Sequence, residues 1–245
     1  MCLMLIRMTS ESTLAKIHRL NKASLWQASY AIFRKDWKSE LRTRYAMSAL
    51  VMFVVTTISI ILFALGSEGA SVNALSGMLW VAVFFAAMSG LSRTFVSEEE
   101  RGTSMTLQLV ATPTAVLLGK LMFNLVLVLL LNIFVVVLYT IFITEFVIKS
   151  YGIFVVIVGL GSIGFAASAT IIAAIIARAN TKGTLYPVMA FPILLPLLLT
   201  VINGTRLATE GAFFEEAFGE FNLLVSYVAA VLAVSYIVFE YIWKD

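Results

Sequence analysis

The stretch LLGKLMFNLVLVLLLNIFVVVLYTIFIT, residues 117–144, decides the fold class of this chain. After Lys120 it runs for 24 residues without a charge. The hydrocarbon core of a bilayer is about 30 Å thick, and a helix needs about 20 consecutive apolar residues to cross it. Backbone polar groups in hydrocarbon must be satisfied within the segment itself, and a helix does this. The stretch therefore predicts a transmembrane helix.

Five further apolar runs have comparable length, so the chain is predicted to cross the membrane six times. The predicted spans are Ala46–Leu65, Val72–Leu91, Leu117–Thr144, Tyr151–Ala177, Thr184–Ile202 and Phe221–Ile242. The fifth contains Pro187, Pro192 and Pro196, so we expect a kinked or broken helix there. Asn203-Gly204-Thr205 directly after it matches a glycosylation sequon but is better interpreted as a turn. We expect an all-α polytopic membrane protein, with the six-helix transmembrane domain at residues 46–245.

The overall composition supports a membrane protein. Of the 245 residues, 61% are hydrophobic and 13% are charged, whereas soluble domains carry about 25% charged residues. The net charge of +3 would be compatible with nucleic-acid binding, but the positive residues flank the hydrophobic runs. We therefore expect the basic residues to contact a lipid bilayer and not a nucleic acid.

The positions of Lys and Arg predict the orientation of the spans. Cytoplasmic flanks of membrane proteins carry an excess of these residues. With the N-terminus inside, fifteen of the 17 Lys and Arg fall on the inner side, and only Lys149 and Arg206 lie outside. The inner residues are Arg7, Lys16, Arg19, Lys22, Arg34, Lys35, Lys38, Arg42, Arg44, Arg93, Arg101, Lys120, Arg178, Lys182 and Lys244. Both termini are therefore predicted to be cytoplasmic.

Residues 24–45, ahead of the first span, are predicted to form an amphipathic helix that lies in the membrane interface. Their aromatic and apolar residues recur every three or four positions and form one stripe. These are Trp26, Tyr30, Phe33, Trp37, Leu41 and Tyr45. The basic residues fall largely off the stripe, so the rings would lie at headgroup depth with the cations towards anionic lipid. The alternative is a soluble helix that packs on a partner. Residues 1–23 form a cytoplasmic tail.

Nucleotide-binding motifs give no support for an enzyme. Gly159, Gly161 and Gly164 match the dinucleotide pattern GxGxxG, but they lie inside an apolar span, with no acidic residue in 179–184. Close helix packing explains them better, because Ser162, Ala166, Thr170 and Ala174 continue a small-residue face. The P-loop pattern GxxxxGK[ST] is absent from the sequence, so ATP hydrolysis by that route is excluded. We predict no catalytic residues.

Polar residues within the spans are few. Asn124 and Asn132 lie about 80° apart on the third helix. They either hydrogen-bond to neighbouring helices or line a pathway. Lys120, near the start of this span, is expected to snorkel to the interface. The middle of every span lacks the charge that ion-coupled pumps keep there, so the energy for any transport would come from elsewhere.

Residues 92–116, between the second and third spans, are the most informative cytoplasmic segment. Glu98, Glu99 and Glu100 give it a charged start, Gly102 permits a turn, and Thr103 or Ser104 can cap a helix. The following residues are too apolar for a free loop, and Pro113 ends the unit. These are Met105, Leu107, Leu109 and Val110. The segment is interpreted as an element that docks on a partner; the alternative is a helix lying on the membrane.

Metal or haem ligation by this chain alone has little support. The only histidine, His18, and the only cysteine, Cys2, lie in the N-terminal tail, so no span contains either residue type. The ten methionines are scattered, and filling gaps in the core is their usual role. We therefore expect no metal site and no cofactor held by this chain alone.

The loop resembles the Glu-x-x-x-Gly-Thr element of type-2 ABC exporter permeases, in which an interfacial elbow helix precedes six spans. Within that class the chain is most similar to the CcmB family, haem exporter protein B of cytochrome c maturation. The similar stretches are FRKDWKSELRTR (33–44), MLWVAVFFAAMSGLSRTFVSEEERGT (78–103), ATPTAVLLGK (111–120) and LYPVMAFPILLPLLLTVINGTR (185–206). The resemblance begins at about Ser24, and the longer tail departs from it.

The resemblance implies a function and a set of partners. Glu98, Glu99, Glu100, Gly102 and Thr103 would couple the permease to a separate CcmA-type ATPase. CcmC- and CcmD-type membrane subunits and the haem chaperone CcmE would be further partners in a bacterial inner membrane. Haem would be transported or bound by the complex. Two alternatives are a type-2 exporter permease for lipid, polysaccharide or drug, and a structural assembly subunit without a substrate path.

Overall fold

The protein is described from a computed structural model. The structure describes residues 25–42, 44–66, 69–91, 94–95, 98, 102–178 and 186–244. Within these ranges the regular secondary structure is α-helical and no strand is present, which confirms the predicted all-α fold. The predicted tail 1–23, together with Glu99, Glu100 and Arg101, lies outside the described residues.

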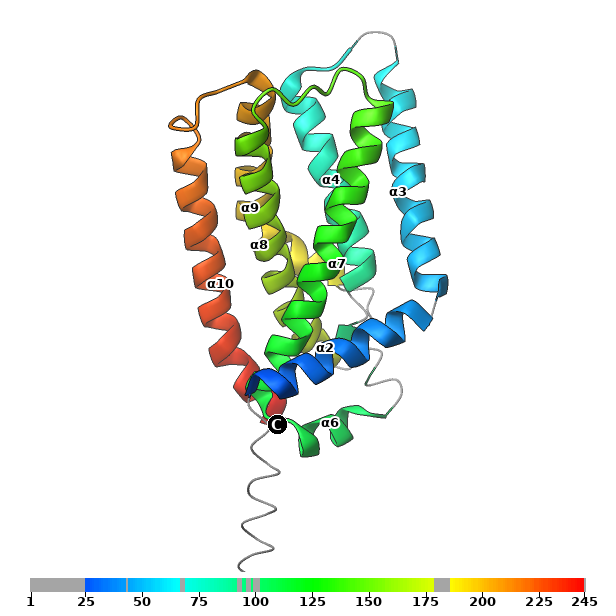
Figure 1. Cartoon of the computed structure of the whole chain (residues 1–245), viewed down its shortest axis with the longest axis vertical. Helices are drawn as coiled ribbons and strands as arrows, with labels where there is room; N and C mark the ends of the chain where they lie inside the picture. The colour runs from blue at the N-terminus through cyan, green and yellow to red at the C-terminus, as the bar shows by residue number, and fades with distance from the viewer. Residues whose placement is uncertain are drawn as a thin grey trace, which may run out of the picture.

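Six helices are long and apolar enough to cross a membrane, as predicted from the sequence. They are α3 (Arg44–Leu65), α4 (Val72–Leu91), α7 (Pro113–Phe142), α8 (Tyr151–Arg178), α9 (Tyr186–Glu210) and α10 (Phe218–Lys244). They run side by side as one bundle (Figure 1). Two further helices of the described part, α2 (Leu25–Arg42) and α6 (Ser104–Val110), lie at one end of this bundle, which we call the α2 end.

The third span begins four residues earlier than predicted. Pro113 occupies the first turn of α7, and the Thr112 side chain accepts a hydrogen bond from the Ala115 N–H at 3.4 Å. A proline is well suited to this position, because the N–H that it lacks would have had no partner within the helix. Pro113 therefore both closes the preceding loop and starts the span.

The fifth span was expected to be kinked or broken at its prolines, and the structure excludes the broken form. α9 is one helix from Tyr186 to Glu210, with Pro192 and Pro196 inside it. Hydrocarbon offers the backbone no other hydrogen-bond partners. The residues other than proline therefore keep their backbone hydrogen bonds within the helix. The Tyr227 hydroxyl of α10 also donates to the Ile193 carbonyl at 2.9 Å, between the two prolines.

The predicted turn at Asn203-Gly204-Thr205 is also wrong, because α9 continues through it. Gly204 packs directly on Ile157 of α8. The Thr205 hydroxyl accepts a hydrogen bond of 2.8 Å from the Trp80 indole N–H of α4, and both side chains are buried. Polar residues thus extend the span because neighbouring helices bury and satisfy them.

Close approach of helices to α8 builds the core. A Cβ at Gly161 would lie 3.0 Å from both Trp80 and Val201, and one at Gly164 would lie 2.7 Å from Leu197. Gly159 has no such neighbour within 4 Å. The motif lies within one helix, so packing against α4 and α9 accounts for two of its three glycines.

Candidate functional site

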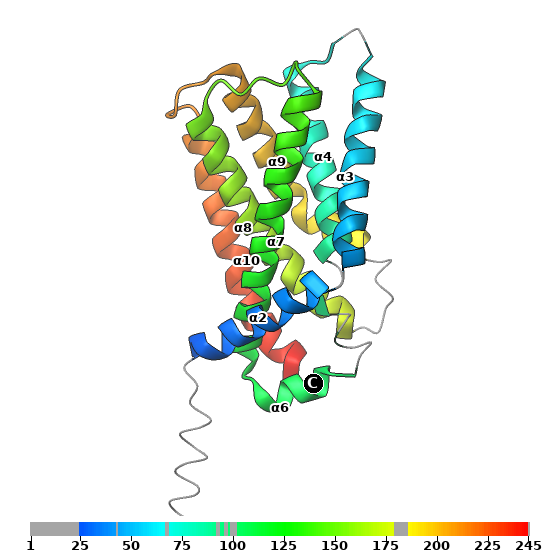
Figure 2. The same cartoon turned by 45° about the vertical axis from the view of Figure 1, so that its right-hand side comes forward.

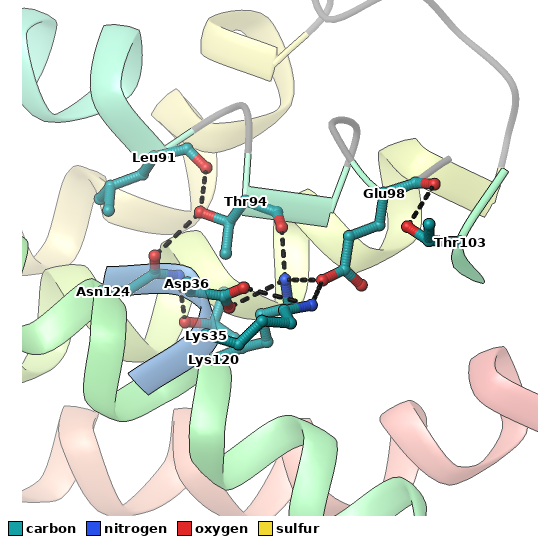
Figure 3. A network of polar contacts seen from close by, with 9 residues as sticks. Lys35, Asp36, Leu91, Thr94, Glu98, Thr103, Lys120 and Asn124 are labelled. Carbon is teal, nitrogen blue, oxygen red and sulfur yellow. Dashed lines mark hydrogen bonds and ion pairs between the residues drawn. The ribbon is translucent and has the colours of Figure 1, made fainter. Parts of the chain in front are cut away.

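Lys120 of α7 is the centre of a buried ion cluster at the α2 end. Its side chain is 1% exposed. Its Nζ lies 3.0 Å from Oδ2 of Asp36 in α2 and 2.8 Å from Oε1 of Glu98. It also donates to the Thr94 carbonyl at 2.7 Å, and the Phe95 ring centroid is 5.2 Å away. Figure 3 shows Asp36, Thr94 and Glu98 around the ammonium groups of Lys120 and Lys35.

The expectation that Lys120 snorkels to the interface is therefore wrong. Snorkelling places an ammonium in water because hydrocarbon cannot solvate it. Here Asp36, Glu98 and the Thr94 carbonyl replace water inside the protein. The charge stays buried because its partners come from two other segments that pack on the start of α7.

The cluster contains two cations and two carboxylates. Lys35, whose side chain is 48% exposed, pairs with Glu98 and lies 3.3 Å from Oδ1 of Asp36. Burial alone would raise the pKa of Glu98, but the charges and hydrogen bonds of Lys120 and Lys35 outweigh it and hold that pKa below its usual value. Burial would lower the pKa of Lys35, but Glu98 and Asp36 raise it overall. Glu98 and Lys35 therefore stabilise each other's charged forms, and the formal charges of the two lysines and two carboxylates sum to zero.

Uncharged hydrogen bonds continue from this cluster into the bundle. The Thr94 hydroxyl lies 2.9 Å from the Asn124 amide oxygen, and the Asn124 amide donates to Thr170 of α8 at 2.8 Å. Two turns further along α7, Asn132 donates to Ser162 of α8 at 2.7 Å. Both asparagines are at most 1% exposed. Of the two interpretations of these asparagines, the contacts agree with hydrogen bonding between helices.

Glu98 and Thr103, at the two ends of the predicted coupling element, are hydrogen-bonded to each other. Thr103 donates to the Glu98 carbonyl through its backbone N–H at 3.0 Å and its hydroxyl at 3.3 Å. Gly102 has φ +63°, a left-handed conformation that favours glycine. Thr103 occupies the N-cap of α6, but its side chain does not cap that helix, because it is used in this turn. The Glu98 side chain points into the ion cluster.

Helix α6 presents an exposed apolar face at the α2 end. Met105, Leu109 and Val110 are 76%, 88% and 77% exposed. On its other side Leu107 packs against the core, and Gln108 donates to the Trp243 carbonyl of α10 at 3.2 Å. The segment that begins with Glu98 is therefore attached to α7 through the ion cluster and to α10 through α6.

The predicted aromatic stripe of α2 is divided between two environments. Trp26, Tyr30 and Leu41 are 69%, 56% and 56% exposed, whereas Phe33 and Trp37 pack against the core with ring centroids 6.3 Å apart. α2 lies close against α7, because a Cβ at Gly119 would be 2.8 Å from the Ser29 carbonyl and the Ile32 side chain. Tyr45, the last residue of the predicted stripe, belongs to α3.

The prolines of the fifth span are not among the residues of this cluster. Pro192 and Pro196 are exposed on the outer side of α9, and the side chain of Pro187 lies outside the described part. His18 and Cys2 also lie outside the described residues. The expectation that this chain holds no metal or haem by itself therefore stays a prediction.

Sequence reasoning missed three members of the ion cluster: Lys35, Asp36 and Thr94. A lysine that interrupts an apolar run was the available signal, because a cation there needs carboxylate partners if it is not to reach water. It could not reveal which acidic residues supply them. Asp36 precedes Lys120 by 84 positions, and only the packing of α2 on α7 brings the two together.

The fold and the site together define a polytopic α-helical membrane protein with a buried ion cluster at one end of its helix bundle. The model of the CcmB protein family matches residues 27–240, and the chain belongs to this family. The family consists of permease subunits for cytochrome c maturation and haem export, which work with an ATPase and other Ccm components. Comparison with individual curated proteins gives no match, so the assignment rests on the family model.

Proposed function

We propose that this subunit converts ATP-driven movement of a separate CcmA-type ATPase into rearrangement of its six spans during cytochrome c maturation. The observation that supports this most directly is the position of Lys120. One buried ammonium, carried by α7, contacts Asp36 of α2 and Glu98. A displacement of the Glu98 segment therefore acts on two helices at once.

The α2 end faces the cytoplasm in this proposal, and both termini lie there. The distribution of Lys and Arg supports the orientation, with Lys149 and Arg206 at the opposite end. Cysteine substitution at Lys149 and at Thr103, in a chain whose Cys2 is replaced by serine, tests it. A membrane-impermeant maleimide added outside should label position 149 and spare position 103. Labelling at 103 in sealed cells would reverse the assignment.

In the proposed mechanism the ATPase docks on α6 and the turn before it. The exposed side chains of Met105, Leu109 and Val110 offer the apolar contact, and a patch of this kind on the water side of a protein marks an interaction site. Glu99 and Glu100 contribute the charged rim, while Glu98 passes the movement to Lys120. Gln108 passes it to α10 through the Trp243 carbonyl.

The movement is proposed to release the haem-loaded chaperone CcmE, within a complex that includes CcmC- and CcmD-type subunits in the bacterial inner membrane. Haem is the substrate of that complex. None of the six spans contains His or Cys, and Asn124 and Asn132 are used between helices. These observations favour mechanical coupling by this subunit over ligation of haem along its spans. A structural assembly subunit without a substrate path is the alternative that they leave open.

Matched substitutions at the two ends of the bundle test the docking face. Leu109→Glu places a charge on α6, and Phe213→Glu places one at a similarly exposed apolar residue, 78% against 88%, in the loop at the opposite end. At equal expression, L109E should lower recovery of the ATPase on purification and the yield of holocytochrome c in cells. F213E should leave ATPase recovery unchanged. Wild-type recovery and yield with L109E would mean that α6 is only a connector lying on the membrane.

A further inference from the structure

An apolar groove runs along the lateral surface of the bundle, directly beside α2. Its volume is about 300 Å³, at the lower end of the range typical of small-molecule sites. It is lined by Trp37, Glu40 and Leu41 of α2, by Leu50, Val51 and Val54 of α3, and by Leu127, Leu130, Leu131 and Phe134 of α7. Glu40, the one charged lining residue in the described part, already has an interaction within the protein. The groove therefore offers hydrocarbon contacts along a membrane-spanning surface.

The groove has a buried floor and exposed walls. Leu50, Val54 and Leu127 are at most 9% exposed, whereas Val51 and Leu130 are 41% and 47% exposed. Both walls belong to spans, and α2 crosses beneath them at the end of the bundle (Figure 2). A lipid acyl chain that enters the groove from the bilayer would thus run along α3 and α7 and reach α2 at the end of the bundle.

A cationic surface adjoins this end of the groove. Gln27, Tyr30, Ala31, Arg34, Lys35 and Lys38 form a hollow of about 340 Å³ along the outer face of α2. Arg34 and Lys38 are exposed, whereas Lys35 belongs to the ion cluster. At 100° per residue, Lys38 and Leu41 lie about 60° apart around the helix, so the cations begin where the apolar lining ends. Tyr30 adds a hydroxyl to the same face.

We infer that this groove and the adjoining cationic face of α2 together bind one anionic phospholipid. One acyl chain lies in the groove between α3 and α7, and the phosphate and headgroup lie against Arg34 and Lys38. The charge of the face selects an anionic headgroup over a zwitterionic one. The apolar lining selects a lipid over a soluble phosphate compound, because the groove opens on spans that face hydrocarbon.

This inference goes beyond the proposed coupling function and does not depend on it. The bound lipid would fill the angle between α2 and the spans, so that α2 is held on one side by the ion cluster and on the other by lipid. If the lipid site does not exist, the predicted effects of L109E and F213E on ATPase recovery remain the same. Failure of either idea is therefore distinguishable from failure of the other.

Native mass spectrometry of the purified full chain tests the lipid site. The probes are dioleoyl phosphatidylglycerol and dioleoyl phosphatidylcholine, which share their acyl chains and differ in headgroup charge. The wild-type chain should retain one phosphatidylglycerol in preference to phosphatidylcholine. Each surface cation contributes about fivefold to binding of an anionic membrane lipid. Arg34→Gln with Lys38→Gln should therefore weaken phosphatidylglycerol retention about 25-fold and phosphatidylcholine retention little.

A second variant tests the groove independently. Val51→Trp fills it from the α3 wall and should weaken retention of both lipids. Lys149→Gln, an exposed cation at the opposite end, and Val155→Trp, an exposed apolar residue of α8, are the matched controls and should behave as wild type. Thermal unfolding checks that every variant is folded.

Three outcomes would overturn the inference. One is equal retention of the two lipids by the wild-type chain. Another is unchanged phosphatidylglycerol retention in R34Q/K38Q or in V51W. The third is a wild-type chain that retains no lipid and dimerises, with V51W abolishing the dimer, which would assign the groove to a second copy of the chain.

Discussion

The ion cluster around Lys120 makes a quantitative prediction about stability. Lys120→Met keeps the length of the side chain and removes one of two cations, so that Asp36 and Glu98 share only Lys35. Removing one partner of a buried ion pair costs about 3–5 kcal/mol. Lys35 still contacts both carboxylates and is half exposed, so the lower end of this range, about 3 kcal/mol, applies. For a soluble chain of this length that corresponds to a fall of about 6–12 °C in Tm.

A double-mutant cycle separates the charge from the packing. Glu98→Gln alone leaves a net positive cluster and should cost about 2 kcal/mol, less than K120M, because Lys35 can turn towards water. K120M combined with E98Q leaves Lys35 opposite Asp36 and restores neutrality. The double variant should therefore be more stable than the sum of the single losses by about 1–3 kcal/mol.

The assay is thermal unfolding of purified protein in one detergent, followed by the loss of the monodisperse peak in size-exclusion chromatography. Lys149→Met, which removes an exposed cation at the opposite end, is the control and should change stability by less than about 0.5 kcal/mol. A K120M chain as stable as wild type would refute the buried-cluster reasoning. Strict additivity of K120M and E98Q would show that the two side chains do not interact.

Two further predictions follow from the same region. Because the folded-state pKa of Glu98 lies below its usual value of 4.5, its stabilising contribution should be complete above that pH and lost as the pH falls through the lower folded value. The raised pKa of Lys35 gives a contribution that is complete below 10.5 and lost as the pH rises through its folded value. The difference in Tm between wild type and E98Q should thus be constant from about pH 5 to 8 and shrink in stronger acid; a pH-independent difference would contradict the ionised pair. Gly119→Ala should destabilise the chain by about 1–3 kcal/mol, because its Cβ would meet the Ser29 carbonyl and Ile32 at 2.8 Å. Gly159→Ala, in open space within α8, should be neutral or stabilising by up to about 1 kcal/mol, and equal effects of the two substitutions in thermal unfolding would argue against tight packing of α2 on α7.

The family and the number of spans were readable from the sequence because both depend on local patterns. Twenty or more apolar residues in succession have one stable solution in hydrocarbon, whatever surrounds them. The loop that begins with Glu98 could be singled out by its Glu-x-x-x-Gly-Thr spacing. Its left-handed Gly102 agrees with the turn expected there. The docking of this loop on an ATPase stays a prediction.

The expectations that failed concern residues whose state depends on neighbours distant in the chain. Pro192 and Pro196 were expected to kink or break the fifth span, and the broken form is excluded because α9 continues through both. Asn203-Gly204-Thr205 looked like a turn, because these residues by themselves favour one. The helix continues through them because Trp80 and Ile157 pack against it. Phe33 and Trp37 were predicted to lie at headgroup depth, which stays a prediction, and their additional packing against the core could not be foreseen from the stripe alone.

The sequence by itself determined that this is a six-span membrane protein with an amphipathic helix ahead of the spans, since hydrophobic run length and helical periodicity are properties of contiguous residues. Only the tertiary structure decided that Lys120 is buried. A lysine near a helix end can reach water or find carboxylates, and the choice depends on whether α2 and the Glu98 segment lie within about 3 Å of its ammonium. No local sequence pattern encodes the distance between Asp36 and Lys120, because it results from the packing of α2 on α7 at Gly119.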